Sequence, residues 1–182
     1  PVTNTLQVII LPSPTVSAGN NQTICATASA ALNGTVTGAT NTGSWSSSGS
    51  GTFSPSFTIL NPTYFPSAAD IAAGSVTLTL TSTNNQGCFA GTGSVVVFLQ
   101  NPPIANAGLN PTVCANNNTV ILSGAIIGFP ATPVWSSSGT GAFTPATSLN
   151  TSYIPSVADI NSGLITLSLT TANNGVCPAS TS

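Results

Sequence analysis

Residues 45–55 read WSSSGSGTFSP, and residues 135–145 read WSSSGTGAFTP. A second matching pair follows, with YFPSAADI at residues 64–71 and YIPSVADI at residues 153–160. The offset between the copies is about 89 residues. That period is too long for a solenoid repeat and has the length of a small, independently folding domain. The sequence therefore predicts two copies of one domain.

The ends of the chain are out of phase with this repeat. Residues 2–11, VTNTLQVIIL, are similar to residues 92–100, TGSVVVFLQ, which close the first copy. The second copy reaches Ser182 before its own version of that segment. Either the chain is a window of a longer tandem array, which we favour, or the stray strand completes a neighbouring molecule by β-strand addition. We predict three parts: residues 1–11 as the last strand of a preceding repeat, residues 12–100 as a complete repeat, and residues 101–182 as a repeat lacking its last strand.

Each copy has the pattern of short β-strands. Aliphatic residues alternate with Thr from Val76 to Thr81, and the second copy repeats this pattern from Ile165 to Thr170. Such alternation indicates strands with one face on a core and one face in water. Turn sequences such as Asn33-Gly34 separate the candidate strands. We predict an all-β fold of tandem immunoglobulin-like (Ig-like) β-sandwiches, with about seven antiparallel strands in each domain. Besides the alternating stretch, the candidate strands of the first copy are residues 15–18, 28–37, 43–47, 52–54, 63–65 and 92–99.

The composition excludes many functions. Lys, Arg, His and Met are absent, and 28 Thr, 25 Ser and 18 Asn dominate the chain. Without basic side chains the protein cannot neutralise phosphates, so nucleic-acid binding is excluded. Without His or Lys the usual general bases and Schiff-base nucleophiles are missing, so we expect no catalytic residues and no enzyme. We also expect no cofactor, and the chain is too short of apolar runs for membrane insertion.

The only carboxylates are predicted to cap two short helical turns. Ser67 and Asp70, like Ser156 and Asp159, have the spacing of a capping box, in which Ser precedes an acid by three residues. An acid in the first turn also faces the positive end of the helix dipole. A metal-ligand role for these residues is the alternative. However, one Asp per repeat cannot build a calcium cage, so we expect no metal.

The four cysteines are predicted to form one disulfide in each repeat. The repeat favours the pairs Cys25–Cys88 and Cys114–Cys177, since each domain is then self-sufficient and both loops have the same length. A zinc site is the competing interpretation, but the chain has neither His nor CxxC spacing. Disulfides indicate an oxidising, extracellular compartment.

The aromatic residues repeat as well and are predicted to form the two cores. Trp45 and Trp135 lie on the third candidate strand, where sandwiches commonly bury a Trp, and Tyr64 and Tyr153 are repeat equivalents. Sugar stacking on the Trp side chains is the alternative, as in a carbohydrate-binding module. An ice-binding face of outward Thr is another, although Thr is ordinary on the wet face of a strand.

The ordered motifs P-x-x-x-A-G … C … L-x-G … W-S-S-S-G-x-G-x-F … Y-x-P-S-x-x-D-I-x-x-G-x-[VI]-T-L-x-L-T … N-N-x-x-C cover both copies. This pattern resembles the Ig-like or PKD-like repeats of giant Bacteroidota cell-surface proteins, the group that includes the SprB-like gliding-motility adhesins. The resemblance implies type IX secretion, attachment to the outer membrane and a long filament of tandem domains.

We therefore expect a structural repeat segment of a long extracellular filamentous adhesin. Its role would be a semi-rigid, disulfide-stapled stalk in bacterial cell-surface adhesion or gliding motility, with neighbouring repeats as its partners. The alternative is a short pilus-like filament subunit, assembled by donor-strand exchange through residues 2–11. The stalk predicts a very long native chain, whereas the pilus subunit predicts a short one.

Overall fold

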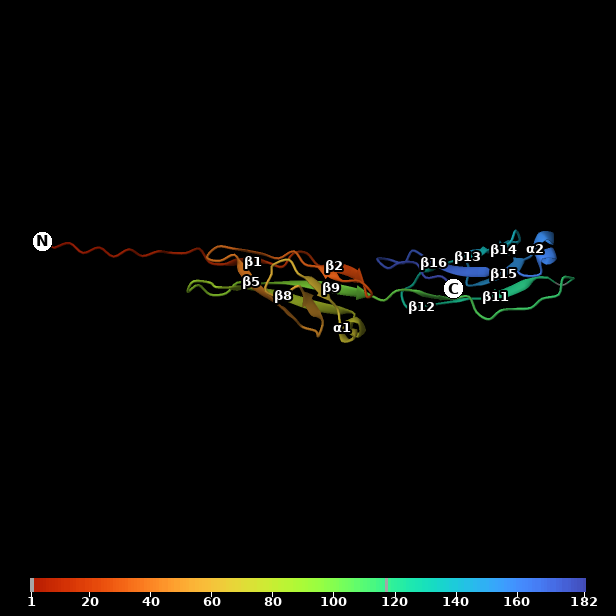
Figure 1. Cartoon of the computed structure of the whole chain (residues 1–182), viewed down its shortest axis with the longest axis horizontal. Helices are drawn as coiled ribbons and strands as arrows, with labels where there is room; N and C mark the ends of the chain where they lie inside the picture. Colours follow the sequence, from red (N-terminus) through yellow and green to blue (C-terminus); the bar gives the residue numbers. More distant parts are fainter. Residues whose placement is uncertain (1, 117) are drawn as a thin grey trace. The chain divides into compact units, whose positions relative to one another are not determined.

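The computed structural model describes residues 2–116 and 118–182. The chain forms two compact units, each built of short strands and one short helix (Figure 1). Unit 1 comprises Pro1–Ile24 and Ala28–Leu99, and unit 2 comprises Cys25–Thr27 and Gln100–Ser182.

The larger sheet of unit 1 has four strands in the order β2-β9-β8-β5. The long strands β8 and β9 form an antiparallel hairpin in which Leu78 lies opposite Val95. β2 runs parallel to β9, because Val96 N–H donates to Asn21 (2.9 Å) and Ala26 N–H donates to the Gln100 carbonyl (2.8 Å). The bounds are Gln22–Cys25 for β2, Thr42–Ser47 for β5, Ser75–Thr83 for β8 and Thr92–Gln100 for β9.

A second sheet, β3-β7-β6, and the pair β1-β4 complete unit 1. The predicted single strand over residues 28–37 is wrong, because β3 and β4 belong to different sheets. Between them the backbone pairs with the 60–62 segment, since Leu32 N–H donates to Pro62 and Gly34 N–H to Leu60. The bounds are Thr15–Ser17 for β1, Ala30–Ala31 for β3, Thr35–Thr37 for β4, Thr52–Ser54 for β6, Thr63–Phe65 for β7 and Ala68–Ala73 for the helix α1.

Unit 2 repeats this plan with a smaller sheet. The sheet β11-β15-β14 and the pair β10-β12 correspond to β3-β7-β6 and β1-β4, but only β13 and β16 stand where unit 1 has four strands. Residues 180–182 begin to pair with β16, with Thr170 bridged to Thr181. The bounds are Ile104–Asn106 for β10, Val120–Ser123 for β11, Ala125–Ile127 for β12, Thr132–Ser137 for β13, Ala142–Thr144 for β14, Asn150–Ile154 for β15, Leu167–Ala172 for β16 and Val157–Ser162 for the helix α2.

The two cores differ where the sheets differ. In unit 1, Val76 and Leu78 on β8 are buried, with β9 paired alongside, whereas their equivalents in unit 2, Ile165 and Leu167, are only half-buried. The buried core of unit 1 is Ala18, Ala30, Leu32, Val36, Trp45, Tyr64, Val76, Leu78, Leu80, Val95, Val97 and Leu99. The buried core of unit 2 is Ala105, Val120, Leu122, Trp135, Tyr153 and Leu169.

Candidate functional site: carboxylate clamps, cysteines and an open sheet edge

A buried carboxylate organises one end of unit 1. Ser67 is the N-cap of α1, and its hydroxyl accepts a hydrogen bond from Asp70 N–H (3.1 Å). One oxygen of Asp70 accepts from the backbone N–H groups of Ser67 (2.9 Å) and Gly51 (3.0 Å) and from the Tyr64 hydroxyl (2.7 Å). Its other oxygen accepts from Ser50 N–H (3.0 Å). We call this arrangement the carboxylate clamp, since it ties α1 and β7 to the turn before β6.

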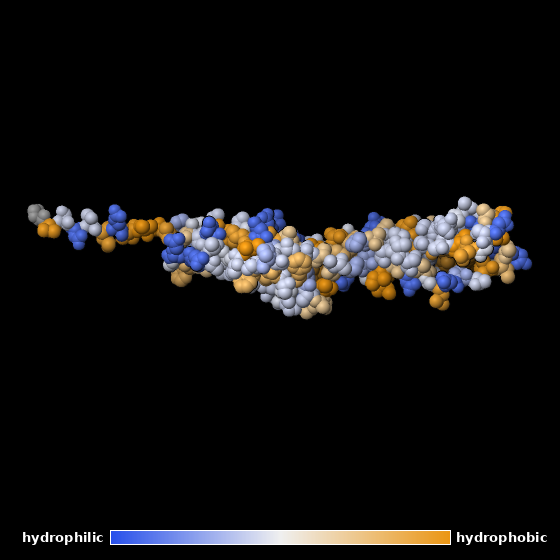
Figure 2. Space-filling view, in the orientation of Figure 1, coloured by the Kyte–Doolittle hydropathy of each residue, from blue (hydrophilic) through white to orange (hydrophobic). Residues whose placement is uncertain are grey.

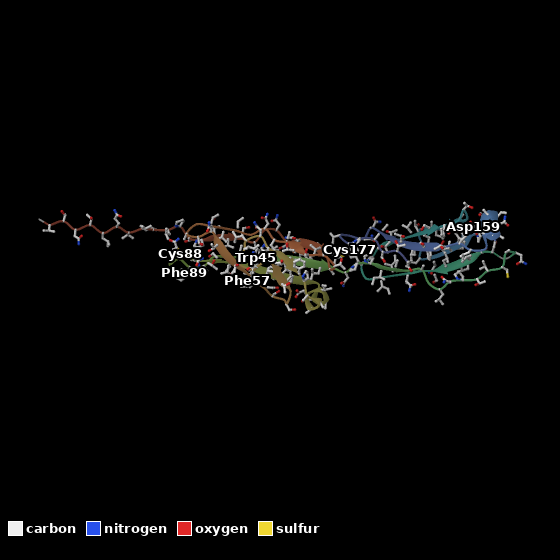
Figure 3. All side chains as sticks on the ribbon, viewed as in Figure 1. Trp45, Phe57, Cys88, Phe89, Asp159 and Cys177 are labelled. Carbon is white, nitrogen blue, oxygen red and sulfur yellow. A yellow bond between two sulfur atoms is a disulfide. The ribbon has the colours of Figure 1, made fainter. Side chains whose placement is uncertain are left out.

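Unit 2 contains the same clamp. Asp159, in the first turn of α2 (Figure 3), accepts from the N–H groups of Ser156 (3.0 Å), Thr140 (2.9 Å) and Gly141 (2.8 Å) and from the Tyr153 hydroxyl (2.8 Å). Ser156 is the N-cap of α2, and both residues form a complete capping box. The WSSSGxG motif therefore supplies the turn whose backbone binds the carboxylate.

These hydrogen bonds stabilise the ionised carboxylates. Burial raises the pKa of Asp70, but hydrogen bonds from Ser67 N–H, the Tyr64 hydroxyl and Ser50 N–H outweigh burial and lower the pKa below its ordinary value of 3.8. The hydrogen bonds to Asp159, above all from Ser156 N–H and Thr140 N–H, lower its pKa to about 2. All the donors come from this chain, so the geometry gives both carboxylates a role in the fold. Among the described residues, no group of three or more His, Cys, Asp or Glu could hold a metal ion.

The repeated aromatic residues lie in the two cores. Trp45 is 3 % exposed and donates to the Leu60 carbonyl (3.1 Å), while Trp135 is 4 % exposed and donates to the Ser148 carbonyl (3.0 Å). Tyr64 and Tyr153 are fully buried, and their hydroxyls donate to the carboxylates of the two clamps. At this low exposure neither Trp presents an open face to solvent on which a sugar could stack.

A disulfide is present, but its partners differ from the predicted pairs. Cys25 is bonded to Cys177, with their Cα atoms 4.9 Å apart, and Cys88 and Cys114 are free thiols. The predicted bridges Cys25–Cys88 and Cys114–Cys177 are therefore wrong. Around the observed bridge, Cys177 Sγ lies 3.3 Å from the Gln100 carbonyl, and the Gln100 side chain donates to Asn174 O (2.6 Å).

The strand order explains why the predicted pairs cannot form. Cys88 lies in the loop before β9 (Figure 3), whereas Cys25 is the last residue of β2, beside Gln100 at the far end of β9. Nine residues of strand rise about 30 Å, while a disulfide needs Cα atoms about 6 Å apart. Cys114 and Cys177 are separated in the same way. Cys114 lines the same cavity as Leu167, the first residue of β16, whereas Cys177 follows the last residue of β16. The two cysteines therefore lie at opposite ends of this strand.

Unit 2 contains an open sheet edge above that cavity. The cavity has a volume of about 560 Å³, and its apolar lining includes Val120, Leu122, Trp135, Ile165 and Leu167. In unit 1 the corresponding place is filled by β9, whose Val95 and Val97 are completely buried. In the described part of unit 2, no strand pairs with residues 164–168 on the edge away from β13.

Comparisons with known proteins bear on the fold. No protein-family model and no curated protein matches the chain. Among solved structures, the eight N-terminal Ig domains of the Down syndrome cell adhesion molecule superpose with a TM-score of 0.63 at 13 % identity, covering 93 % of this chain and 27 % of that one. The titin I-band fragment I67–I69 gives a TM-score of 0.54 at 16 % identity, covering 96 % and 65 %. Ig domains 1–5 of Sidekick-1 give 0.52 at 14 % identity, covering 96 % and 38 %.

The chain thus spans between about a quarter and two thirds of the length of these structures. At such low identity the likeness shows the fold alone. Each structure is a tandem array of Ig domains, of adhesion or structural type. The chain is an all-β protein made of tandem Ig-like β-sandwiches with a disulfide.

Proposed function

We propose that this chain is a structural repeat segment of a long extracellular adhesin filament on a bacterial cell surface. The observation that carries the proposal is that an 89-residue repeat builds the same Ig-like sandwich twice, with the same carboxylate clamp in each copy. The solved structures with similar folds are tandem Ig arrays, one of them a cell adhesion molecule by description and one a fragment of titin. A stalk requires this architecture of repeated domains.

The covalent connectivity supports a load-bearing role. Because Cys25 is bonded to Cys177, a force applied to the two ends of the chain passes through the disulfide. The 151 residues between the two cysteines are then bypassed and cannot be stretched out while the bond persists. Within each unit the clamp holds the short helix to the turn that precedes β6 or β14.

The surface chemistry also fits an exposed stalk. With no Lys or Arg, the chain has no trypsin cleavage site, and its hydroxyl and amide groups supply solubility in place of charge. No helix in the described residues is long and apolar enough to cross a membrane. The resemblance to Bacteroidota surface repeats extends the proposal to type IX secretion, outer-membrane attachment and gliding motility. The segment would need no cofactor or catalytic residue and would have neighbouring repeats as its partners.

The first test is the mass of the native polypeptide that carries this sequence, measured on cell extracts under reducing and denaturing conditions with an antibody to unit 1. We expect a chain of several hundred kilodaltons that is lost from intact cells on treatment with an external protease of broad specificity. A polypeptide no longer than these 182 residues would contradict the stalk and would fit a short filament subunit. A long chain that resists external protease but is digested in lysed cells would contradict the surface location.

A further inference from the structure

Gln100 contacts both sides of the Cys25–Cys177 bridge. The face seen in Figure 2 mixes hydrophilic and hydrophobic residues, and a chain without basic side chains makes its polar contacts mainly through amides, hydroxyls and backbone groups. Gln100, the last residue of β9, supplies such an amide. Its carbonyl accepts from the N–H of Ala26 (2.8 Å), next to Cys25, and lies 3.3 Å from Cys177 Sγ. All of these residues belong to unit 2.

The Gln100 side chain holds the loop that carries Cys177. Its Nε2 donates to the Asn174 carbonyl (2.6 Å), and its Oε1 accepts a longer hydrogen bond from Val176 N–H (3.4 Å). A side-chain amide has one donor group and one acceptor, so these two bonds use both. The amide therefore fixes the backbone immediately before Cys177, while the carbonyl of the same residue fixes the backbone immediately after Cys25.

Gly175 allows the loop to come this close. A Cβ at residue 175 would overlap Oε1 and Nε2 of Gln100. The φ angle of Gly175 is 63°, and the equivalent residue in the loop of unit 1, Gln86, also has a positive φ of 51°. This turn therefore accepts a side chain as far as its backbone conformation is concerned, and it is the contact with Gln100 that requires glycine.

The two loops are otherwise held alike. In unit 2 the Asn174 carbonyl accepts from Cys177 N–H (3.2 Å), and in unit 1 the Asn85 carbonyl accepts from Cys88 N–H (2.9 Å). The side-chain amide of each Asn also donates to the carbonyl three residues before it. Both turns therefore present their cysteine in the same local geometry, and the contact with Gln100 singles out the residue that follows the Asn.

We propose that Gln100 and Gly175 direct Cys25 to Cys177: the amide docks the loop and the glycine admits it, so that the two sulfur atoms meet. Gln100 is a positioning residue, since it takes no part in the exchange of bonds. Holding two reacting groups together in this way raises their effective concentration. A loop with a side chain at this position, such as the loop that contains Gln86, is excluded because it would overlap the amide.

Formation of the bond needs a disulfide oxidant, for which we name oxidised glutathione. The Cys177 thiolate attacks the glutathione disulfide, forming a mixed disulfide and releasing one reduced glutathione. The Cys25 thiolate then attacks the Cys177 sulfur and releases the second. Two protein thiols lose two electrons and two protons, and the two reduced glutathiones carry them away. The second step is intramolecular, so its equilibrium depends on how well the loop is docked.

The experiment is equilibration of the purified chain with mixtures of reduced and oxidised glutathione. A Cys88→Ser, Cys114→Ser background leaves Cys25 and Cys177 as the only cysteines, so alkylation of free thiols followed by intact mass measures this one bond. We expect Gln100→Ala to lower the equilibrium constant for forming the bond by about tenfold, because two hydrogen bonds to the loop are lost. An unchanged constant would overturn the proposal.

A second variant tests the fit of the glycine. Gly175→Gln introduces the side chain that unit 1 has in the same turn and should lower the constant at least as much as Gln100→Ala. In the double variant the amide is gone, so the loss should be little larger than that of Gln100→Ala alone. A double variant whose loss is the product of the two single losses would show that the residues act separately, which contradicts their proposed contact.

Two controls separate docking of the loop from a general loss of structure. Gln86→Gly makes the reverse change in unit 1 and should leave the constant unchanged; a loss equal to that of Gly175→Gln would refute the role of the contact. The unfolding midpoint of unit 2, followed by Trp135 fluorescence in a reduced Trp45→Phe chain, should shift little in Gln100→Ala. A large drop there would show that Gln100 supports the whole unit and would refute the positioning role. The result does not depend on the proposed stalk role, which the native mass tests separately.

Discussion

Asp70 and Asp159 are the only side chains that carry a charge at neutral pH, and each accepts hydrogen bonds from three backbone N–H groups and one Tyr hydroxyl. Backbone groups in a tight turn cannot pair with each other, so without the carboxylate several donors would be buried without a partner. The adjacent glycines belong to the same arrangement, because a Cβ at Gly49 or Gly139 would overlap the carboxylate. The acid, the Tyr and the glycines are therefore one interdependent group in each copy.

Replacing Asp70 with Asn should destabilise unit 1 by about 1–3 kcal/mol, the cost of leaving buried donors unsatisfied. The amide keeps the shape of the carboxylate but turns an NH₂ group toward N–H donors. Urea unfolding followed by Trp45 fluorescence in a Trp135→Phe background measures the effect. Asn20→Asp, an exposed change in the same unit, is the control and should leave the midpoint nearly unchanged. Equal midpoints for Asp70→Asn and the parent chain would show that the clamp contributes nothing to stability.

The same carboxylates should set the pH dependence of stability. The pKa of Asp159 is about 2 in the folded chain and 3.8 ordinarily, so the unfolded state binds more protons between these values. The clamp's contribution is thus fully present above about pH 4 and is lost as pH falls toward 2. Thermal unfolding midpoints should be level from pH 5 to pH 7, where no side chain with an ordinary pKa titrates, and should drop below pH 4. The Asp70→Asn, Asp159→Asn double variant should lose most of this drop; an unchanged drop would contradict the assignment.

At the scale of the elements, alternation of residue types predicted most strands but could not assign them to sheets. The stretch from Val76 to Thr81 lies within β8, and the Ser-x-x-Asp signals mark α1 and α2. The four residues of β2 are too few for a periodic signal, and their parallel pairing with β9 is a tertiary feature. The mistaken disulfide pairs follow from this gap. Repeat symmetry is satisfied equally well by cysteines of one copy or of successive copies, and only the position of β2 decides between them.

The same substitution should cost less in unit 2 than in unit 1, because Leu167 is less buried than its equivalent Leu78. Leu78 on β8 is fully buried, so Leu78→Ala should cost about 2–5 kcal/mol. Leu167 is half-buried at the open edge, so Leu167→Ala should cost roughly half as much. Fluorescence of Trp45 or Trp135, each in a background lacking the other, reports the two units separately. Equal losses would show that the difference in burial between the two Leu side chains does not decide the cost.

At the scale of the whole chain, the covalent path matters more than the number of domains. The Cys25–Cys177 bond encloses nearly all of both repeats, so a pull on the ends bypasses the sandwiches. A stalk made only of domains in series would lengthen each time one of them unfolded. With a bridge that connects successive copies of the repeat, unfolding of an enclosed sandwich adds no length until the sulfur–sulfur bond is reduced.

Single-molecule stretching by the two ends tests this directly. In the oxidised chain only residues 1–25 and 177–182 lie outside the bridge, so extension should stop after about 100 Å. With a reductant the 152-residue separation is released and should add roughly 500 Å, in steps as the two units unfold. A Cys25→Ser, Cys177→Ser variant should show the long extension without reductant, whereas Cys88→Ser, Cys114→Ser should behave like the parent chain. Long extension of the oxidised parent would show that the bridge does not form, and the stalk would then have to resist force through its hydrogen bonds alone.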